Sequence, residues 1–82
     1  MARLLVTDAF SWIGGAPPRS GAAVEAQLRA HGLPHAARVV EAAAGSVELH
    51  FDTPASQVSP GQAVVLYRGD EVIGGGGVET AA

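Results

Sequence analysis

The chain has 82 residues, no cysteine and a formal net charge of −3. A chain this short forms one domain (residues 1–82) with a modest core, because it buries only ~60–65% of the surface of its unfolded form. Without cysteine there are no disulfides, no thiolate chemistry and few ways to hold a structural zinc ion. The acidic balance argues against strong non-specific binding to nucleic acid, which needs many cations facing phosphates.

The sequence predicts no membrane segment. Its longest apolar run is far below the ~20 residues of a membrane helix, and its N-terminus lacks the pattern of a signal peptide. We therefore expect a soluble protein of the cytoplasm with no membrane partner.

The N-terminal third predicts short strands around a loop. Residues 4–6 form an apolar run bounded by Asp8, and apolar residues return in 10–13, so this part is either two short strands or one bent strand. Residues 14–21 contain three glycines and two prolines and predict a loop.

Two alanine-rich segments leave the choice between strand and helix open. Residues 22–31 alternate apolar and polar side chains, which favours a half-buried strand, yet their composition also suits a helix. Residues 36–42 present the same choice, and Gly45 then serves either as a hairpin turn residue or as the residue that ends a helix.

Residues 46–52 give the clearest strand signal, because apolar and polar side chains alternate strictly there. Thr53 and Pro54 are expected to end this strand, and residues 53–61 to connect it to the next.

Residues 59–78 predict a hairpin. Pro60 and Gly61 suit the two central positions of a type II turn, and residues 63–67 form an apolar run typical of a strand. Gly69 lies in the next turn, before the return strand starts at residues 72–73. Four consecutive glycines are then expected to pack closely where the last strand bends: Gly74, Gly75, Gly76 and Gly77.

Short strands separated by turns every ~8–12 residues are typical of an all-β barrel or sandwich. Several motifs in one order then narrow the choice: Phe-Asp-x-Pro at residues 51–54, Pro-Gly-Gln at 60–62, a tyrosine at 67, Gly-Asp at 69–70 and the glycine run. This order, with Trp-Ile-Gly at residues 12–14, resembles the C-terminal domain of bacterial tRNA-specific 2-thiouridylases nearly end to end. The resemblance implies a small closed antiparallel β-barrel of six or seven short strands, and closure favours a monomer because it removes free strand edges.

The same resemblance implies a function without catalysis. Enzymes of that family thiolate the wobble uridine of certain tRNAs, using ATP to activate the base and cysteines to relay sulfur. This chain lacks both cysteine and the Ser-Gly-Gly-x-Asp-Ser loop that handles ATP. It is therefore expected to have no catalytic residues and no cofactor, and to help hold tRNA beside a catalytic adenylating domain in cis or in trans.

Four basic side chains are the candidate RNA contacts, because guanidinium forks match phosphate geometry and strand alternation can place them on one outer face: Arg29, His31, Arg38 and Arg68. The alternative is that they are ordinary solvated charges paired with Glu25, Glu41 or Asp70.

Three further hypotheses concern other functions. His31 and His35 predict no metal site, because a stable site wants three or four ligands. A free-standing barrel that binds a protein instead of RNA is the main alternative function. A sulfur carrier that ends in Gly-Gly is another, and it requires removal of residues 78–82 after the glycine run.

Overall fold

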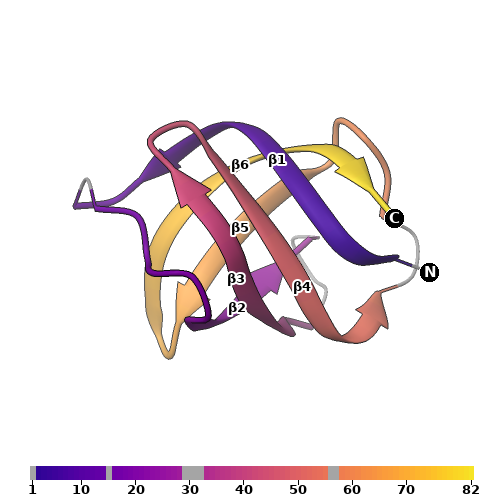
Figure 1. Cartoon of the computed structure of the whole chain (residues 1–82), viewed down its shortest axis with the longest axis horizontal. Helices are drawn as coiled ribbons and strands as arrows, with labels where there is room; N and C mark the ends of the chain where they lie inside the picture. Colours follow the sequence, from indigo (N-terminus) through magenta and orange to yellow (C-terminus); the bar gives the residue numbers. More distant parts are fainter. Residues whose placement is uncertain (1, 15, 29–32, 56–57) are drawn as a thin grey trace.

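The computed structural model describes residues 2–14, 16–28, 33–55 and 58–82. They form six strands: β1 (Ala2–Trp12), β2 (Ala23–Gln27), β3 (His35–Ala43), β4 (Ser46–Ala55), β5 (Ala63–Arg68) and β6 (Glu71–Ala81). All neighbours pair antiparallel, and the sheet closes into a barrel in the order β1-β4-β3-β2-β5-β6 (Figure 1). The predicted all-β closed barrel is confirmed, and within the described part of the chain there is no helix that could cross a membrane.

The N-terminal segment forms one bent strand, which is one of the two expected alternatives. β1 pairs with β4 as far as Val6 and with β6 from Leu5 to Trp12, and the register with β6 shifts between Asp8 and Ser11. Ala9 lies in this shift and has a φ of 47°, which is unusual for a residue with a side chain. The expected boundary at Asp8 is therefore a bend inside a continuous strand.

The two alanine-rich segments are strands. In β2 the side chains of Val24 and Ala26 are buried and their neighbours are not, and β3 alternates in the same way at Ala37 and Val39. Gly45 lies in the tight turn that joins β3 to β4 and accepts a hydrogen bond from the backbone N–H of Phe10 at 2.9 Å.

β4 is longer than the sequence indicates. It continues through Thr53 and Pro54 to Ala55, which pairs with Ala2. The prediction that Thr53 and Pro54 end the strand is wrong, because the pairing with β1 passes from His50 to Ala55 through an irregularity. Proline lacks an N–H, and here it stands where the regular ladder is already interrupted.

The inward side chains of all six strands form one core in the middle of the barrel. They are mostly valines and leucines, with small alanines between them, and they include Leu5, Val24, Val39, Leu49, Phe51, Leu66, Ile73 and Val78. The other side chains of each strand face outward. Because the core fills the inside of the barrel, a binding site must lie on the outer faces or at the ends of the barrel.

The hairpin of β5 and β6 has the predicted turn geometry. Gly61 has a φ of 87°, and the backbone N–H of Gln62 donates to the carbonyl of Ser59 at 3.2 Å, as in a type II turn. The side chain of Gln62 holds this turn on both sides: its amide donates to the carbonyl of Leu28 at 2.9 Å, and its oxygen accepts from the N–H of Ser59. Gly69 has a φ of 62° at the first position of the turn between the two strands.

The glycine run lies inside β6, and residues on both sides of it are paired. Gly74 pairs with Leu66 and Trp12, and beyond the run Val78 and Thr80 pair with β1. A sulfur carrier needs its glycines at a free chain end, so the fold gives that alternative no support.

Replacing Thr7 by valine should destabilise the barrel by about 1–3 kcal/mol. Thr7 is fully buried, and its hydroxyl donates to the carbonyl of Val47 at 3.2 Å and accepts from the N–H of Val47 at 2.9 Å. Thr7→Val removes the hydroxyl and leaves two backbone groups buried without these partners. Urea unfolding followed by circular dichroism measures the loss, and Thr7→Ser, which keeps the hydroxyl, should lose less than about 1 kcal/mol. A Thr7→Val variant as stable as the parent would contradict this role.

Candidate nucleic-acid interface

Arg38 stands on the outer face of β3. It is exposed, and its cross-strand neighbours are Ala23 on β2 and His50 on β4. One guanidinium nitrogen donates to the carbonyl of Gly21 at 3.2 Å, so the side chain also fastens the loop before β2 to the barrel. A guanidinium has five N–H donors, and this bond uses one of them.

Arg68 ends β5 and is also exposed, opposite Glu71 of β6. β2 separates β5 from β3, and the register brings both arginines to the same end of β2. Arg38 pairs with Ala23, and Arg68 follows Tyr67, the partner of Glu25. The fold therefore brings two of the four candidates to one surface; Arg29 and His31 lie outside the described residues.

Two basic residues near Arg38 were not singled out from the sequence. His50 lies directly opposite Arg38 on β4 and is exposed. Arg19 is exposed in the loop that Arg38 fastens, where its carbonyl accepts from the N–H of Ala22 at 3.0 Å. The alternation of residues 46–52 places His50 on the outer face, but its neighbour on β3 depends on a register that the sequence does not give.

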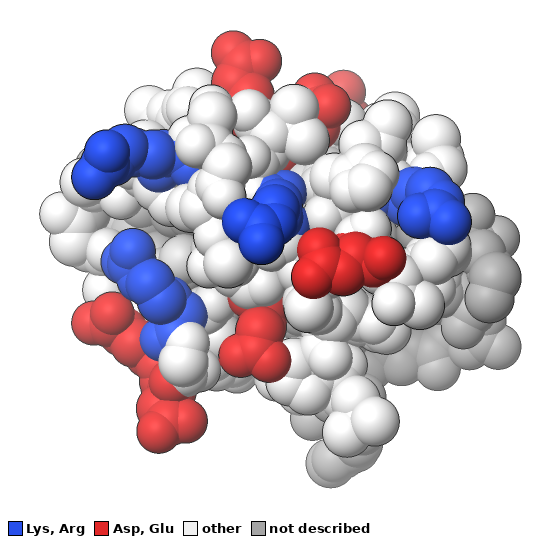
Figure 2. All heavy atoms as spheres, turned by 60° about the horizontal axis from the view of Figure 1, so that its bottom comes forward, with Lys and Arg blue, Asp and Glu red and all other residues white. Residues whose placement is uncertain are grey.

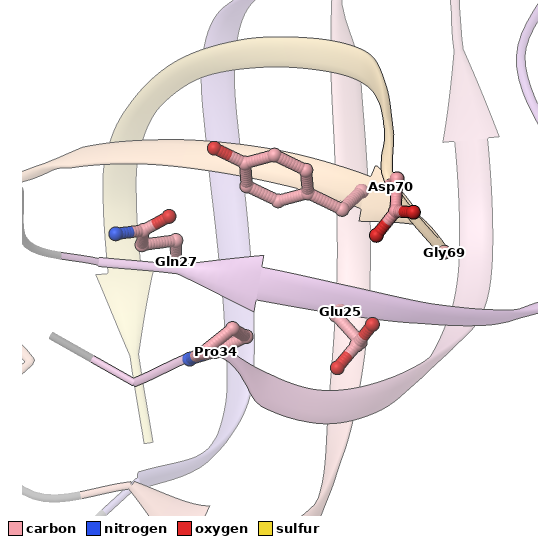
Figure 3. A pocket seen from close by; sticks show the side chains of 6 residues that line it. Glu25, Gln27, Pro34, Gly69 and Asp70 are labelled. Atoms are coloured by element: carbon pink, nitrogen blue, oxygen red, sulfur yellow. The ribbon is translucent and has the colours of Figure 1, made fainter.

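A groove runs over the outside of β2 beside these arginines. It consists of two adjoining hollows, of about 280 and 300 Å³, that share Glu25, Tyr67 and Gly69. We call it the β2 groove. The first hollow is also lined by Gln27, Pro34 and Asp70, and the second by Ala23, Val24, Ala36, Ala37, Asp52 and Arg68. Figure 3 shows the first hollow, with Glu25 and Gln27 on β2 and Asp70 in the turn after β5.

The charges on this side of the barrel are mixed. Figure 2 shows arginine side chains spread over one face with acidic side chains between them, instead of one continuous basic patch. Within the β2 groove, Arg68 is accompanied by the carboxylates of Glu25, Asp52 and Asp70. Such a surface can form a few chosen phosphate contacts, but it cannot attract RNA strongly at long range.

Trp12 and His35 have structural contacts. The indole N–H of Trp12 donates to the carbonyl of Ala43 at 2.7 Å, and its ring packs on Phe10 with centroids 4.5 Å apart. The imidazole of His35 lies edge-on to Phe51, with centroids 5.8 Å apart. Among the residues that the structure describes, no three His, Cys, Asp or Glu side chains are grouped to hold a metal ion.

The fold and this outer face define a class of protein: a small closed β-barrel that offers a grooved surface for binding. Residues 2–78 match the family described as the aminomethyltransferase beta-barrel domain, and the chain belongs to that family. Its relatives narrow the assignment further. The chain is 40% identical over 79 residues to the tRNA-specific 2-thiouridylase MnmA of Chlorobium chlorochromatii. The aligned residues cover 96% of this chain and 22% of that protein.

Other relatives carry the same name. The MnmA of Chloroflexus aurantiacus is 44% identical over 75 residues, covering 92% of this chain and 21% of the relative. That of Cupriavidus metallidurans is 42% identical over 67 residues, covering 82% and 19%. The chain thus spans about a fifth of the length of these relatives. It corresponds to the C-terminal domain of the tRNA-specific 2-thiouridylases, as the motifs predict.

Proposed function

We propose that this barrel is the non-catalytic C-terminal module of a tRNA-specific 2-thiouridylase. In this role it helps to bind or position tRNA while a separate catalytic domain, in cis or in trans, carries out ATP-dependent 2-thiolation of the wobble uridine. The module acts in the cytoplasm as a monomer and uses no cofactor of its own.

The observation that carries the proposal is the similarity of almost the whole barrel to proteins named tRNA-specific 2-thiouridylases. Two exposed arginines at one end of β2 support a contact with RNA. Arg68 lines the second hollow of the β2 groove, and Arg38 lies opposite Ala23, another residue of that hollow. The mixed charge of the groove supports a positioning role in which a larger enzyme supplies most of the affinity.

Binding to a tRNA with a wobble uridine should be weak and depend on salt. Each phosphate contact that is lost lowers the slope of log Kd against log salt concentration by about 1. Arg38→Gln and Arg68→Gln should each weaken binding at low salt and flatten this slope by about 1. Fluorescence anisotropy of labelled tRNA measures the affinity and the slope. The titrations run from about 20 to about 150 mM salt, a range over which the Debye length shortens and exposed charges become more screened.

Arg3→Gln is the matched control, because it removes the same charge from β1, a strand that is not adjacent to β2. It should leave the slope nearly unchanged. If the parent chain binds no tRNA at the lowest salt, or if Arg3→Gln matches the other two variants, the proposed contact surface is wrong.

A protein partner is the second candidate function. The observation that favours it is the set of three carboxylates in the groove, Glu25, Asp52 and Asp70, which complement a cationic segment better than a phosphate chain. Saturable binding of an arginine-rich peptide, with no binding of tRNA at low salt, would select this function.

A further inference from the structure

An aromatic ring lines the β2 groove on the outside of the barrel. Tyr67 follows the buried Leu66 on β5 and is half-buried, so its side chain belongs to the outer face. Its cross-strand neighbours are Glu25 on β2 and Val72 on β6. On the far side of Glu25 the neighbour is Ala36, whose small side chain leaves room beside the carboxylate.

The hollow beside Tyr67 has the size of a site for one small planar group. Its volume of about 280 Å³ lies just below the ~300–1,000 Å³ range of pockets for larger ligands. Single-stranded RNA is commonly recognised by stacking its unpaired bases on aromatic side chains and by hydrogen bonds to the base edges. Tyr67 supplies the first of these elements.

The polar groups around the ring favour one base over the others. The carboxylates of Glu25 and Asp70 line the hollow with the amide of Gln27 (Figure 3), and an ionised carboxylate can only accept hydrogen bonds. Guanine presents two adjacent donors on its Watson–Crick edge, the ring N–H and the exocyclic amino group, which match the two oxygens of one carboxylate. Adenine and cytosine present one donor beside an acceptor, and uracil presents one donor between two acceptors.

Arg68 lines the second hollow of the groove and not the first, and it shares the second hollow with the carboxylate of Asp52. Asp70 and Gln27 line the first hollow, whereas Arg68 lines the second, and the hollows meet at Glu25, Tyr67 and Gly69. A nucleotide with its base beside the Glu25 carboxylate can therefore direct its phosphate towards Arg68. This arrangement reconciles a carboxylate-lined groove with the proposed binding of RNA.

We propose that the β2 groove binds one unpaired guanine of an RNA chain. The base stacks on Tyr67, its Watson–Crick edge donates to Glu25, and the adjoining phosphate contacts Arg68. The inference rests on the proposed function, because it names the nucleotide that a tRNA-positioning barrel would hold.

The test uses the 82-residue chain and three single-stranded RNA pentamers, UUGUU, UUAUU and UUIUU, where I is inosine. Inosine lacks the exocyclic amino group of guanine and keeps the ring N–H. Titrations followed by NMR, with the Tyr67 ring and the Gly69 amide as reporters, should show that the guanine pentamer binds at least about 10-fold tighter than the other two, a step equal to about one hydrogen bond to a charged group. Tyr67→Ala should lose about 5- to 150-fold, the range found for base stacking, and Tyr67→Phe should keep most of the affinity.

Glu25→Gln should abolish the preference for guanine. The matched control is Glu41→Gln, which removes the same charge from an exposed position on β3 that does not line either hollow. It should raise the affinity for all three pentamers equally and keep the preference. Equal binding of the pentamers by the parent chain, or an unchanged preference in Glu25→Gln, would overturn the inference.

A parallel measurement with tRNA separates this inference from the proposed function. If tRNA binds the parent chain and Tyr67→Ala equally well, the guanine site is wrong while tRNA positioning stands. If tRNA does not bind the parent chain at low salt but UUGUU does with the expected preference, the proposed function fails and the guanine site stands. Occupation of the groove by an arginine-rich peptide, with no effect of any pentamer on the reporters, would reject the guanine site.

Discussion

A chain truncated after Gly77 will not fold as a barrel. Residues 78–82 supply the buried Val78 and pair with β1 through Leu5↔Ala81 and Val6↔Thr80. Their loss removes one core side chain, worth about 1.5–3 kcal/mol, and several ladder hydrogen bonds of about 0.5–1.5 kcal/mol each. A domain of this length has a total stability of about 4–12 kcal/mol. The truncation therefore removes most or all of the stability.

Further contacts would be lost with the same residues. The carbonyl of Ala82 accepts from the N–H groups of Arg3 and Leu4 at 2.7 and 2.9 Å, and Val78 exchanges backbone hydrogen bonds with the turn after Pro60 at 2.8 Å. Far-UV circular dichroism and urea unfolding should show an unfolded chain at 25 °C, about the reference temperature of these free energies. Glu79→Ala is the control, because it changes an exposed side chain and keeps the strand.

The result bears on the function of the glycine run. A sulfur carrier would have to remain folded after trimming to Gly-Gly, whereas the barrel needs the segment that trimming would remove. A truncated chain with the unfolding midpoint of the parent would show that β6 beyond Gly77 is dispensable, and it would restore the carrier as a candidate.

Much of the fold could be predicted because its strands carry local signals. Alternation in residues 46–52, the Pro60-Gly61 turn and the apolar run before Gly69 each specify a strand or a turn from neighbouring residues alone. The alanine-rich segments could not be settled in this way, since alanine suits a helix and also fits between larger side chains inside a small barrel. There the pairing with neighbours decides: β2 lies between β3 and β5, where a helix would break the closure.

The candidate site was less predictable, because it depends on strands that are distant in sequence. Glu25 and Tyr67 are opposite each other only because β2 pairs with β5. Arg38 and His50 are cross-strand neighbours only because of the register of β3 with β4. One residue of slip in either pairing would send these side chains to the other face. The residue types could thus be named from the sequence as candidates, but the groove that they form could not.

The four glycines of β6 should divide into two pairs with opposite effects on stability. A Cβ added at Gly74 would lie 2.5 Å from Cε1 of Phe10 and 2.8 Å from the carbonyl oxygen of Ser11, and one at Gly76 would lie 2.9 Å from Cα of Phe10. Gly74 and Gly76 pair with the buried Leu66 and Val64 of β5, so they belong to the inward row. The double variant Gly74→Ala/Gly76→Ala should lose about 2–6 kcal/mol, because each methyl group overpacks the core against backbone atoms that cannot move separately.

The outward pair provides the matched control. A Cβ at Gly75 would meet only the carbonyl oxygen of Val64 at 3.4 Å, and one at Gly77 only a carboxylate oxygen of Asp8 at 3.7 Å, both ordinary contacts. Neither glycine has a positive φ, so alanine lowers the entropy of the unfolded chain without strain, and Gly75→Ala/Gly77→Ala should be neutral or gain up to about 1 kcal/mol for each site. Urea unfolding of the two double variants, each with the same two added methyl groups, measures the difference. Equal losses of stability in both double variants would mean that the glycine run is needed for its backbone freedom. The expected contrast would instead show that the barrel closes because Phe10 packs against Gly74 and Gly76, two positions of β6 without side chains.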